Sequence, residues 1–551
     1  MTKTSPKTWV MACVLVAALL ALLLPLGACA STGSGGTAET YTLDGATCLT
    51  FSDDGIAAEE GSSGGYKIDG TALTINGAGV YAVSGSCADG SITIKKGTPC
   101  VTLVLNGLTL TSSDTAPIAC NKSTEVTIVA ADGTVNTLTD AAENNDDRYP
   151  DNENAENAVI KCKDGSVVTL CGTGTLNVNA NGKNGIKSGA TTDEEGEASL
   201  TIRDLTLNLS APVNDAVNAE QLLNVESGTL TISAADDALH CDLVMNIGAD
   251  GTAGPTIDTT ECCEGIEAAT LNVFSGDVSI NSSDDCMNAA NGGLTGYSFS
   301  MTISGGSIYA HASSGDGFDS NGDLTISGGT VVVWTANTAD NQPLDADGTL
   351  TVSGGVVLAA GGSSGMGVRV NAAQPYIAFG SAGGMGGFRA QGGASSLFPK
   401  GTAFTITDAD GNTVYSGTAV CNANYVFFSS PDLSESESYT LSAAGATVGA
   451  AAAQTGTTSG GLTGGMGGPR PDGAADGMTP PERPDGATDG TTPPALPDGQ
   501  TPPDGQEPPE GMTPPEGFDG TQPPVKPDNG QPPHGAEPPV KPDEAQTTAA
   551  A

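Results

Sequence analysis

One short phrase recurs along the middle of this chain and sets its architecture. Each copy places an acidic or amide residue two positions before a central apolar residue. The central residues are Ile186, Val217, Leu239, Ile266, Met287 and Phe318. They are 31, 22, 27, 21 and 31 residues apart. A period of roughly 20–50 residues is typical of solenoids, in which each turn packs only on its neighbours.

A second phrase alternates with the first and has the period of a β-strand. Apolar residues alternate with Thr, Ser or Asn, and a Gly-Gly bend follows three of the copies. The copies span 222–232, 271–280, 301–306, 324–329 and 350–355. No amphipathic stretch of helical length lies between them. The sequence therefore predicts an all-β fold, a parallel β-helix over residues 41–380. A β-sandwich competes, but it does not explain identical phrases that repeat like ladders.

The N-terminal region reads as a secretion signal. Lys3 and Lys7 precede an uncharged apolar run over 9–26, and Leu26-Gly27-Ala28-Cys29 follows. That tetrapeptide resembles a bacterial lipobox, so residues 1–28 are predicted to be a lipoprotein signal peptide and Cys29 the site of lipidation. A polar linker would cover 29–40. The expected location is the bacterial cell membrane, as a lipoprotein on its extracellular face. An ordinary signal peptide or an uncleaved anchor is the alternative.

The C-terminal region changes composition twice. Residues 381–450 contain a hairpin signal, Asp410-Gly411-Asn412, and are predicted to form a C-terminal β cap that protects the open edge of the helix. Residues 451–551 repeat Thr-Pro-Pro and Gly and have few large apolar residues. Such a segment cannot bury a core, and a disordered Pro/Gly-rich tail is expected.

The charge pattern points to a cation. Between Arg203 and Arg369 there is no lysine or arginine, and these 165 positions hold 21 acids. The formal net charge of −45 also excludes nucleic-acid binding, which needs basic residues. Turns stack about 4.8 Å apart, and two carboxylates at that distance repel by roughly 3–4 kcal/mol at an effective dielectric of 20. The array should therefore attract cations from outside the protein.

Strand alternation places the acids in two columns on one edge of the fold, just before and just after the central apolar residue. Calcium suits this oxygen-rich arrangement, because it accepts many carboxylate and amide oxygens in flexible geometry. Magnesium demands a tighter octahedron, and zinc prefers His and Cys. Solvated turn residues are the alternative. The predicted calcium ligands are Asp215, Glu220, Asp236, Asp237, Asp242, Glu264, Glu267, Asp284, Asp285, Asp316 and Asp319. His240 and His311 are interpreted as surface or ladder residues.

The cysteines favour a packing role over a disulfide framework. Removal of Cys13 and Cys29 leaves 11 of the 13, an odd number. Export would permit disulfides. However, the residue two positions after each central apolar residue is always small, which predicts an interior column where a thiol packs as a small apolar group. That column is Cys120, Cys162, Ser188, Ala219, Cys241, Ala268, Ala289 and Ser320.

Together, the acidic phrases and the Leu-Thr-Ile-Ser-Gly-Gly phrases, in this order, resemble a family of bacterial extracellular carbohydrate-binding β-helix proteins, the Clostridium thermocellum cell-surface type. The resemblance covers roughly residues 41–444. It implies a right-handed parallel β-helix with a pectate-lyase-like fold that binds calcium and polysaccharides such as cellulose or polygalacturonate. Asn184 stands where Asp is usual in the phrase, and Ala216 and Ala238 stand where Gly is usual.

Three functions remain open. A non-catalytic calcium-binding protein for acidic or cellulosic polysaccharide is favoured, because calcium can bridge two acidic partners. A calcium-dependent lyase needs a strong base, which Lys or Arg usually supplies, and the acidic stretch has neither. Lys161, Lys187 and Arg203 lie on earlier turns. A structural surface adhesin is the third possibility.

Overall fold

The computed structural model describes residues 43, 45–59, 64–336, 341–362, 370–380 and 397–457. The described part is all β, with no helix, and therefore contains none that could cross a membrane. Residues 1–40, where a signal peptide, a lipidation site at Cys29 and a linker are predicted, lie outside it. So does most of the predicted tail, although β37 (Ala446–Ala452) and β38 (Gln454–Thr457) extend the β structure past position 450.

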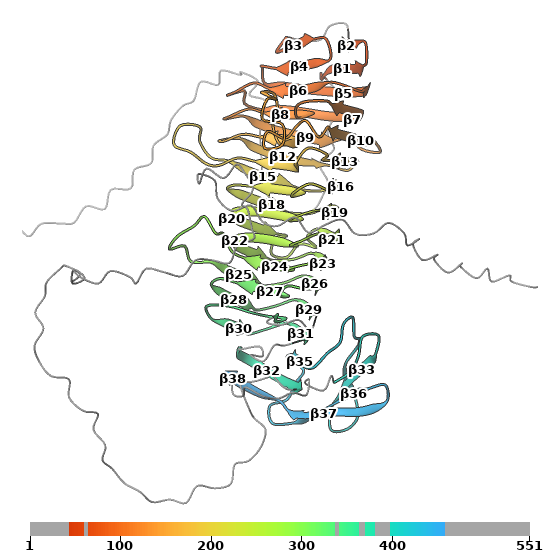
Figure 1. Ribbon diagram of the computed structural model, residues 1–551, viewed down its shortest axis with the longest axis vertical. Coiled ribbons are helices and arrows are strands. Elements are labelled where there is room, and N and C mark those ends of the chain that lie inside the picture. Colours follow the sequence, from red (N-terminus) through yellow and green to blue (C-terminus); the bar gives the residue numbers. More distant parts are fainter. Residues whose placement is uncertain are drawn as a thin grey trace, which may run out of the picture. The chain divides into compact units, whose positions relative to one another are not determined.

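The strands stack along one axis in three parallel series, which we call faces 1, 2 and 3 (Figure 1). Face 1 comprises β8 (Ile118–Cys120), β11 (Ala158–Cys162), β14 (Asn184–Ser188), β17 (Val217–Ala219), the first parts of β20 (Leu239–Ile247) and β22 (Ile266–Val273), β24 (Met287–Ala289) and β27 (Phe318–Ser320). Face 2 comprises β9 (Glu125–Ala130), β12 (Val167–Gly172), β15 (Ser199–Ile202), β18 (Leu222–Val225), the second parts of β20 and β22, β25 (Ser300–Ile303), β28 (Asp323–Ile326) and β30 (Leu350–Val352).

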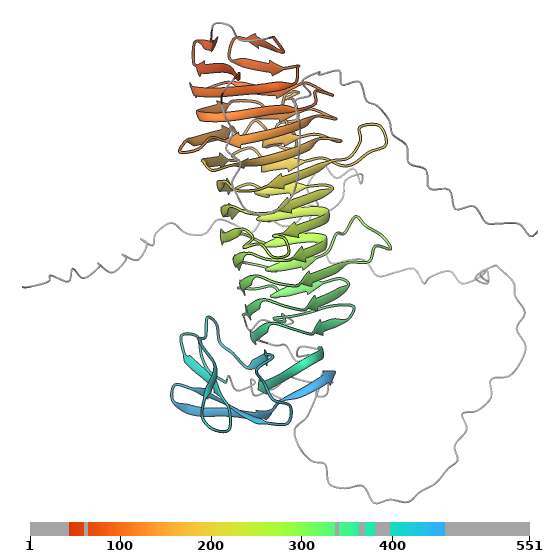
Figure 2. The same cartoon turned by 180° about the vertical axis from the view of Figure 1, so that it is seen from behind.

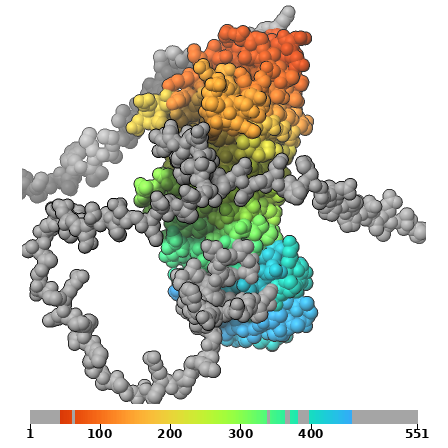
Figure 3. Space-filling model, viewed as in Figure 1, coloured from red at the N-terminus to blue at the C-terminus, as the bar shows by residue number. Residues whose placement is uncertain are grey.

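Face 3 comprises β10 (Val135–Asp140), β13 (Thr175–Asn179), β16 (Thr206–Ala211), β19 (Thr229–Ala234), β21 (Thr256–Glu261), β23 (Asp277–Ser282), β26 (Ser307–Ala312), β29 (Thr330–Thr335) and β31 (Val356–Gly361). The chain visits faces 1, 2 and 3 in turn, so the colours of Figures 1 and 3 run in order along the stack. This arrangement is consistent with a parallel β-helix.

The core is a set of aliphatic ladders. The central residues of the acidic phrases align from strand to strand and are fully buried, from Ile186 to Phe318. The predicted column of small residues is confirmed, since all eight members are at most 1% exposed and Cys120 aligns with Cys162. None of the eleven cysteines among the described residues forms a disulfide. The alternation of apolar and polar residues thus favours strands, because each strand can point its apolar side chains into the core and its polar side chains outward.

The last three bends between faces 2 and 3 are Gly-Gly pairs that stack on one another. Gly306, Gly329 and Gly355 have φ values of 87°, 81° and 79°, a region that favours glycine. A Cβ on Gly328 would collide with the backbone carbonyl of Ser304 on the previous turn. The turns can therefore stack closely only if these positions carry no side chain.

Two loops project from the stack within the 31-residue intervals, as those long repeats predict. Thr191–Ala198 connects β14 to β15, and residues 290–299 connect β24 to β25. Figure 2 shows both loops projecting from the same side of the stack. The acidic loop over 144–157 lies between β10 and β11.

Antiparallel strands lie at both ends of the stack. At the N-terminal end β1 (Thr47–Ser52) pairs with β2 (Gly55–Ala58), and β3 (Tyr66–Asp69) pairs with β4 (Ala72–Ile75). At the other end β35 (Tyr425–Ser429) pairs antiparallel with β31 and with β32 (Asn371–Gly380).

A four-stranded antiparallel sheet follows the stack. It contains β33 (Ala403–Thr407), β34 (Thr413–Thr418), β36 (Ser438–Ala443) and β37. The predicted hairpin at Asp410-Gly411-Asn412 is confirmed, because β33 and β34 pair across it. Trp334 of face 3 packs edge-on against Phe404, with ring centroids 6.0 Å apart, so the sheet shares an aromatic core with the stack.

Candidate functional site on face 1

Two columns of polar side chains follow face 1. The members of the first column are linked through the backbone. The N–H of the residue that follows each member donates to the backbone carbonyl of the next member, one turn along, at 2.9–3.1 Å. These members are Asn184, Asp215, Asp237, Glu264, Asp285, Asp316 and Gln342. The second column follows the central apolar residues and contains Lys161, Lys187, Asn218, His240, Glu267, Asn288 and Asp319. Asp345 continues it, because its backbone N–H donates to the carbonyl of Phe318 at 2.8 Å.

The second column changes charge along its length. Lys161 and Lys187 occupy neighbouring turns, and burial followed by repulsion from Lys187 lowers the pKa of Lys161. Lys187 reaches Glu220 at 3.5 Å between Nζ and Oε1. Further along, the column holds only amides, His240 and acids. The column thus runs from a basic end to an acidic end.

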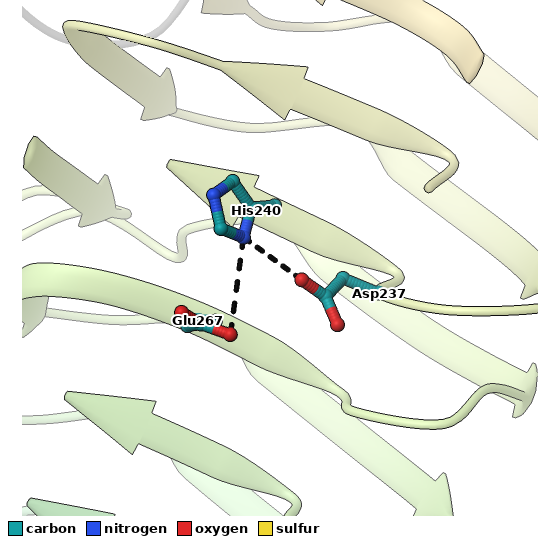
Figure 4. Close-up of side chains that lie close together, drawn as sticks. All are labelled: Asp237, His240 and Glu267. Carbon is teal, nitrogen blue, oxygen red and sulfur yellow. Dashed lines mark hydrogen bonds and ion pairs between the residues drawn. The ribbon is translucent and has the colours of Figure 1, made fainter. Parts of the chain in front are cut away.

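His240 lies among three carboxylates, of which Figure 4 shows those of Asp237 and Glu267. Its Nδ1 is 2.8 Å from Asp237 Oδ2 and 3.9 Å from Glu267 Oε2, and its Nε2 is 3.0 Å from Asp242 Oδ1. Burial alone would lower the pKa of His240, but hydrogen bonds to Asp237 and Asp242 raise it to about 10. Burial raises the pKa of Asp237 to about 6 and that of Glu267 to about 8. A histidinium therefore serves as the internal cation of this group at neutral pH.

Three turns beyond His240, a second group consists of acids. One carboxylate oxygen from each of Asp316, Asp319 and Asp345 lies within 4.8 Å of the others. Burial, together with the neighbouring acids, raises the pKa of Asp316 to about 7 and that of Asp319 to about 6. Between Arg203 and Arg369 the sequence contains no lysine or arginine.

Asp285 joins these three side chains to form what we call the acidic cluster. Its Oδ1 accepts a hydrogen bond from the backbone N–H of Asp316 at 2.6 Å, and the N–H of Gln342 donates to Asp316 Oδ1 in the same way. Burial, reinforced by Asp319, raises the pKa of Asp285 to about 7. These backbone donors fix the carboxylates of Asp285 and Asp316 in place without neutralising them.

An amide oxygen beside the acidic cluster lacks a protein partner. Asn288 aligns with Glu267 on one side and with Asp319 on the other. Its Nδ2 donates to Glu264 Oε2 at 3.2 Å, while its Oδ1 is buried and has no hydrogen-bond partner among the described residues. A buried acceptor without a donor is unfavourable, and a cation would satisfy it.

The remaining predicted ligands are spread along the columns. Asp215 is buried and accepts from Asn218 Nδ2 at 2.6 Å, Asp242 binds His240, and Glu220 pairs with Lys187. Asp236 and Asp284 are exposed on the outer bend. The structure thus gathers two groups, Asp237 with Glu267 around His240, and Asp285, Asp316 and Asp319 with Asp345.

Three residues of the site were missed by sequence reasoning. His240 carried a usable signal, because it follows Asp237-Ala238-Leu239 and alternates outward like its acidic neighbours. Asn288 occupies the corresponding place in its phrase. Asp345 follows Gln342-Pro343-Leu344, which lacks the acidic residue of the phrase, so only the pairing of Leu344 with Phe318 reveals its position.

The two groups differ in the atoms that they offer to a metal ion. The acidic cluster and Asn288 offer only oxygen, which is the ligand set of calcium. Asp237, His240 and Glu267 also lie close enough together to hold a metal ion, but His240 would have to lose its proton to ligate it. The residues present fit calcium at the acidic cluster better than at His240.

Comparisons with known proteins agree on a carbohydrate-binding family. A family model described as "Carbohydrate-binding domain-containing protein" matches residues 69–365, more than half of the chain. A protein of that description from Acetivibrio thermocellus is 32% identical over 173 residues. The match covers 31% of this chain and 58% of the relative, less than two thirds of its length.

One solved structure is also similar, and its title is "Structure of the polysaccharide lyase-like protein from C. thermocellum, Gadolinium derivative". It is 22% identical and covers 57% of this chain and 93% of its own, with a TM-score of 0.29. The family match, by contrast, spans the stack from β4 to the residues that follow β31. The chain belongs to the family of carbohydrate-binding domain-containing proteins.

Proposed function

We propose that this chain binds polysaccharide at the cell surface without cleaving it, through calcium held at the acidic cluster. The observation that carries the proposal is the convergence of one carboxylate oxygen each from Asp316, Asp319 and Asp345 within 4.8 Å. The expected ligand is an acidic polysaccharide of the polygalacturonate type, with cellulose as the other candidate. Family membership supports the carbohydrate as partner.

The electrostatics explain why a cation is needed. A chain with a formal charge of −45 repels an acidic polymer unless a cation lies between them. Calcium takes roughly six to eight oxygen ligands. The acidic cluster and Asn288 would supply some of them, which leaves positions for a sugar carboxylate and for water. Calcium would thus neutralise the cluster and bridge it to the glycan.

Two observations favour binding over catalysis. Lys187 is five turns from Asp319 along the second column, roughly 24 Å at about 4.8 Å for each turn. His240 is held by acids that keep it protonated, so it is a poor general base.

A calcium-dependent lyase is the second candidate. The lowered pKa of Lys161 favours it, because a neutral amine can remove a proton. Unsaturated products detected by their ultraviolet absorbance on incubation with polygalacturonate would support this reading. Lys161 lies one turn further from the acidic cluster than Lys187 does, so we place binding first.

The proposal also includes the setting of the protein. The regular passage through faces 1, 2 and 3 supports a parallel β-helix, and the family resemblance supports its right hand. The lipobox-like Leu26-Gly27-Ala28-Cys29 supports a lipid anchor at Cys29 and a place on the extracellular face of a bacterial membrane.

Two measurements test the proposal. Calorimetric titration of the protein with calcium should show binding, and Asp319→Asn should weaken it by about tenfold or more. Asp236→Asn is the matched control, because Asp236 is an exposed acid outside the cluster. Absence of calcium binding at millimolar concentration would refute the metal site.

An affinity gel loaded with polygalacturonate then tests the partner. Retardation with calcium that disappears with EDTA supports bridging. Equal migration in loaded and empty gels in the presence of calcium would exclude this ligand and point to a structural adhesin.

A further inference from the structure

We infer that face 3 carries a second glycan site, which binds a neutral polysaccharide without calcium. The site is a shallow hollow of about 410 Å³ over β10, β13, β16, β19 and β21. This inference rests on the carbohydrate binding of the proposed function but not on its calcium. Small-molecule sites in proteins commonly occupy roughly 300–1,000 Å³.

The lining of the hollow is polar and neutral. Outward side chains on the five strands include Thr137, Asn177, Asn208 and Thr231, which align on successive turns. A parallel column contains Asn179 and Ser210. None of the described residues that line the hollow carries a charge. The lining of the hollow therefore differs in chemistry from the acid-rich edge of face 1, although the exposed acids Asp258 and Glu261 of β21 lie next to it.

The amides of the hollow are fixed in a hydrogen-bonded ladder. Asn208 Nδ2 donates to Asn177 Oδ1 at 2.8 Å, and Asn177 Nδ2 donates to Thr137 Oγ1 at 3.3 Å. Each amide has two N–H donors, so each of these bonds leaves a second N–H for a ligand. Because the ladder already orders the side chains, a ligand does not have to immobilise them.

This pattern matches the chemistry of sugar hydroxyls. A hydroxyl both donates and accepts, as do the amide and hydroxyl groups of the lining. The turns repeat about every 4.8 Å, similar to the length of one hexose in an extended chain. A polymer could therefore present successive rings to successive turns.

Charge selects a neutral polymer for this hollow. The chain is strongly acidic, and no basic residue lines the hollow to hold a uronate or a sulfate. An uncharged polysaccharide avoids that repulsion and needs no metal bridge. The hollow also contains no aromatic side chain, so hydrogen bonds rather than ring stacking must hold the sugar.

The test uses native affinity gels loaded with β-glucan, xylan or galactomannan, with EDTA throughout. The full-length protein should be retarded by at least one of these gels. Asn177→Leu should weaken the retardation by about three- to tenfold, which corresponds to the loss of one ordered amide. The polygalacturonate gel with calcium should not change for this variant.

Face 2 provides a matched control. Asn224 Nδ2 donates to Thr201 Oγ1 at 3.4 Å, and its own Oδ1 accepts from Asn246 Nδ2 at 2.9 Å. Its place in a ladder is the same as that of Asn177, but it lies outside the hollow. Asn224→Leu should shift the melting temperature as Asn177→Leu does and leave the retardation unchanged.

Three results would overturn the inference. They are no retardation in any of the three gels with EDTA, retardation that appears only in parallel gels where calcium replaces EDTA, and equal weakening by Asn177→Leu and Asn224→Leu. If Asn177→Leu does not fold, Thr231→Val replaces it, since it removes a hydroxyl from the same hollow with little change in shape. None of these results bears on calcium binding at the acidic cluster, so the two proposals fail separately.

Discussion

At the scale of single residues, His240 is the only base among the acids of face 1 beyond Lys187. Replacement of His240 by Gln removes a cation that Asp237, Asp242 and Glu267 share. We expect His240→Gln to lower the free energy of unfolding by about 1–3 kcal/mol, measured by denaturant unfolding without calcium. Added calcium should restore part of the loss, since a metal can take the place of the lost charge.

His311→Gln is the control for that substitution, because burial and Lys400, rather than acids, lower the pKa of His311. A calcium response of the same size in both variants would contradict the role given to His240.

The acidic cluster predicts how stability changes with pH. The pKa of Asp316 rises from 3.8 to about 7 on folding, so the folded state binds this proton more tightly than the unfolded state. Its contribution to stability is therefore complete below pH 3.8 and is lost as the pH rises through about 7. Asp319, with a pKa of about 6, acts in the same direction. Metal-free protein should lose stability across this range.

Melting temperatures at about pH 5 and about pH 8, with and without calcium, check this expectation. Calcium should stabilise the protein more at the higher pH, because it replaces protons that have left. In a double variant with Asp316→Asn and Asp319→Asn, both the calcium effect and part of the pH dependence should disappear. An unchanged pH dependence in that variant would assign the effect to other groups.

The sequence predicted where each acid lies in the fold better than it predicted which residue that acid contacts. Strand parity sufficed to place Glu267, Asn288 and Asp319 on the outer side of face 1. It could not show that Glu220 pairs with Lys187, because the two residues are far apart in the chain and meet only through the stacking of turns. For the same reason, the sequence did not identify Asp345 as a residue of the site.

At the scale of elements, the Gly-Gly bends determine how closely the turns approach. Gly329 has a φ of 81°, and an added Cβ there would lie 2.6 Å from the carbonyl oxygen of Gly306 on the previous turn. We expect Gly329→Ala to destabilise the protein by about 1–3 kcal/mol, because alanine adds backbone strain and a collision. Thermal unfolding measures it.

Gly292→Ala is a suitable comparison for that bend. Gly292 lies in an exposed loop, and an added Cβ meets nothing within 4 Å. A similar loss of stability in both variants would show that the bends do not limit the stacking.

Strand identity was accessible from the sequence because it depends on local alternation. The phrase around Leu324 predicts β28, and the phrase around Leu350 predicts β30. The strand β35 was not predicted individually, since its partners, β31 and β32, run in the opposite direction and belong to a different part of the chain. Pairing between distant segments leaves no periodic signal in either one.

At the scale of the whole stack, calcium should act locally. Turns of a repeat protein interact mainly with their neighbours, so a bound ion stabilises the turns that it bridges. We expect amide hydrogen exchange in β24 and β27 to slow when calcium binds, whereas β13 and β16 of the same protein change little. Uniform protection of all four strands would instead indicate one cooperative unit.

The stretch without basic residues between Arg203 and Arg369 has a different extent in space than in sequence. In the sequence it covers 165 positions, yet Lys187 lies on the turn next to Asn218 and still neutralises Glu220. Lys187 thus reaches into the sequence gap from its basic end, and the acidic cluster lies further along, on the turns around β24 and β27.

The antiparallel pairs at the two ends of the stack have a consequence for how such proteins evolve. Because β1 with β2 closes one end and β35 closes the other, a gene can gain or lose repeats only between them. A duplicated segment is tolerated when it adds a full circuit of three strands, since a partial one would turn core side chains outward. Homologues should thus differ in length by whole circuits, and each added circuit with an acidic phrase would extend the carboxylate columns by one step.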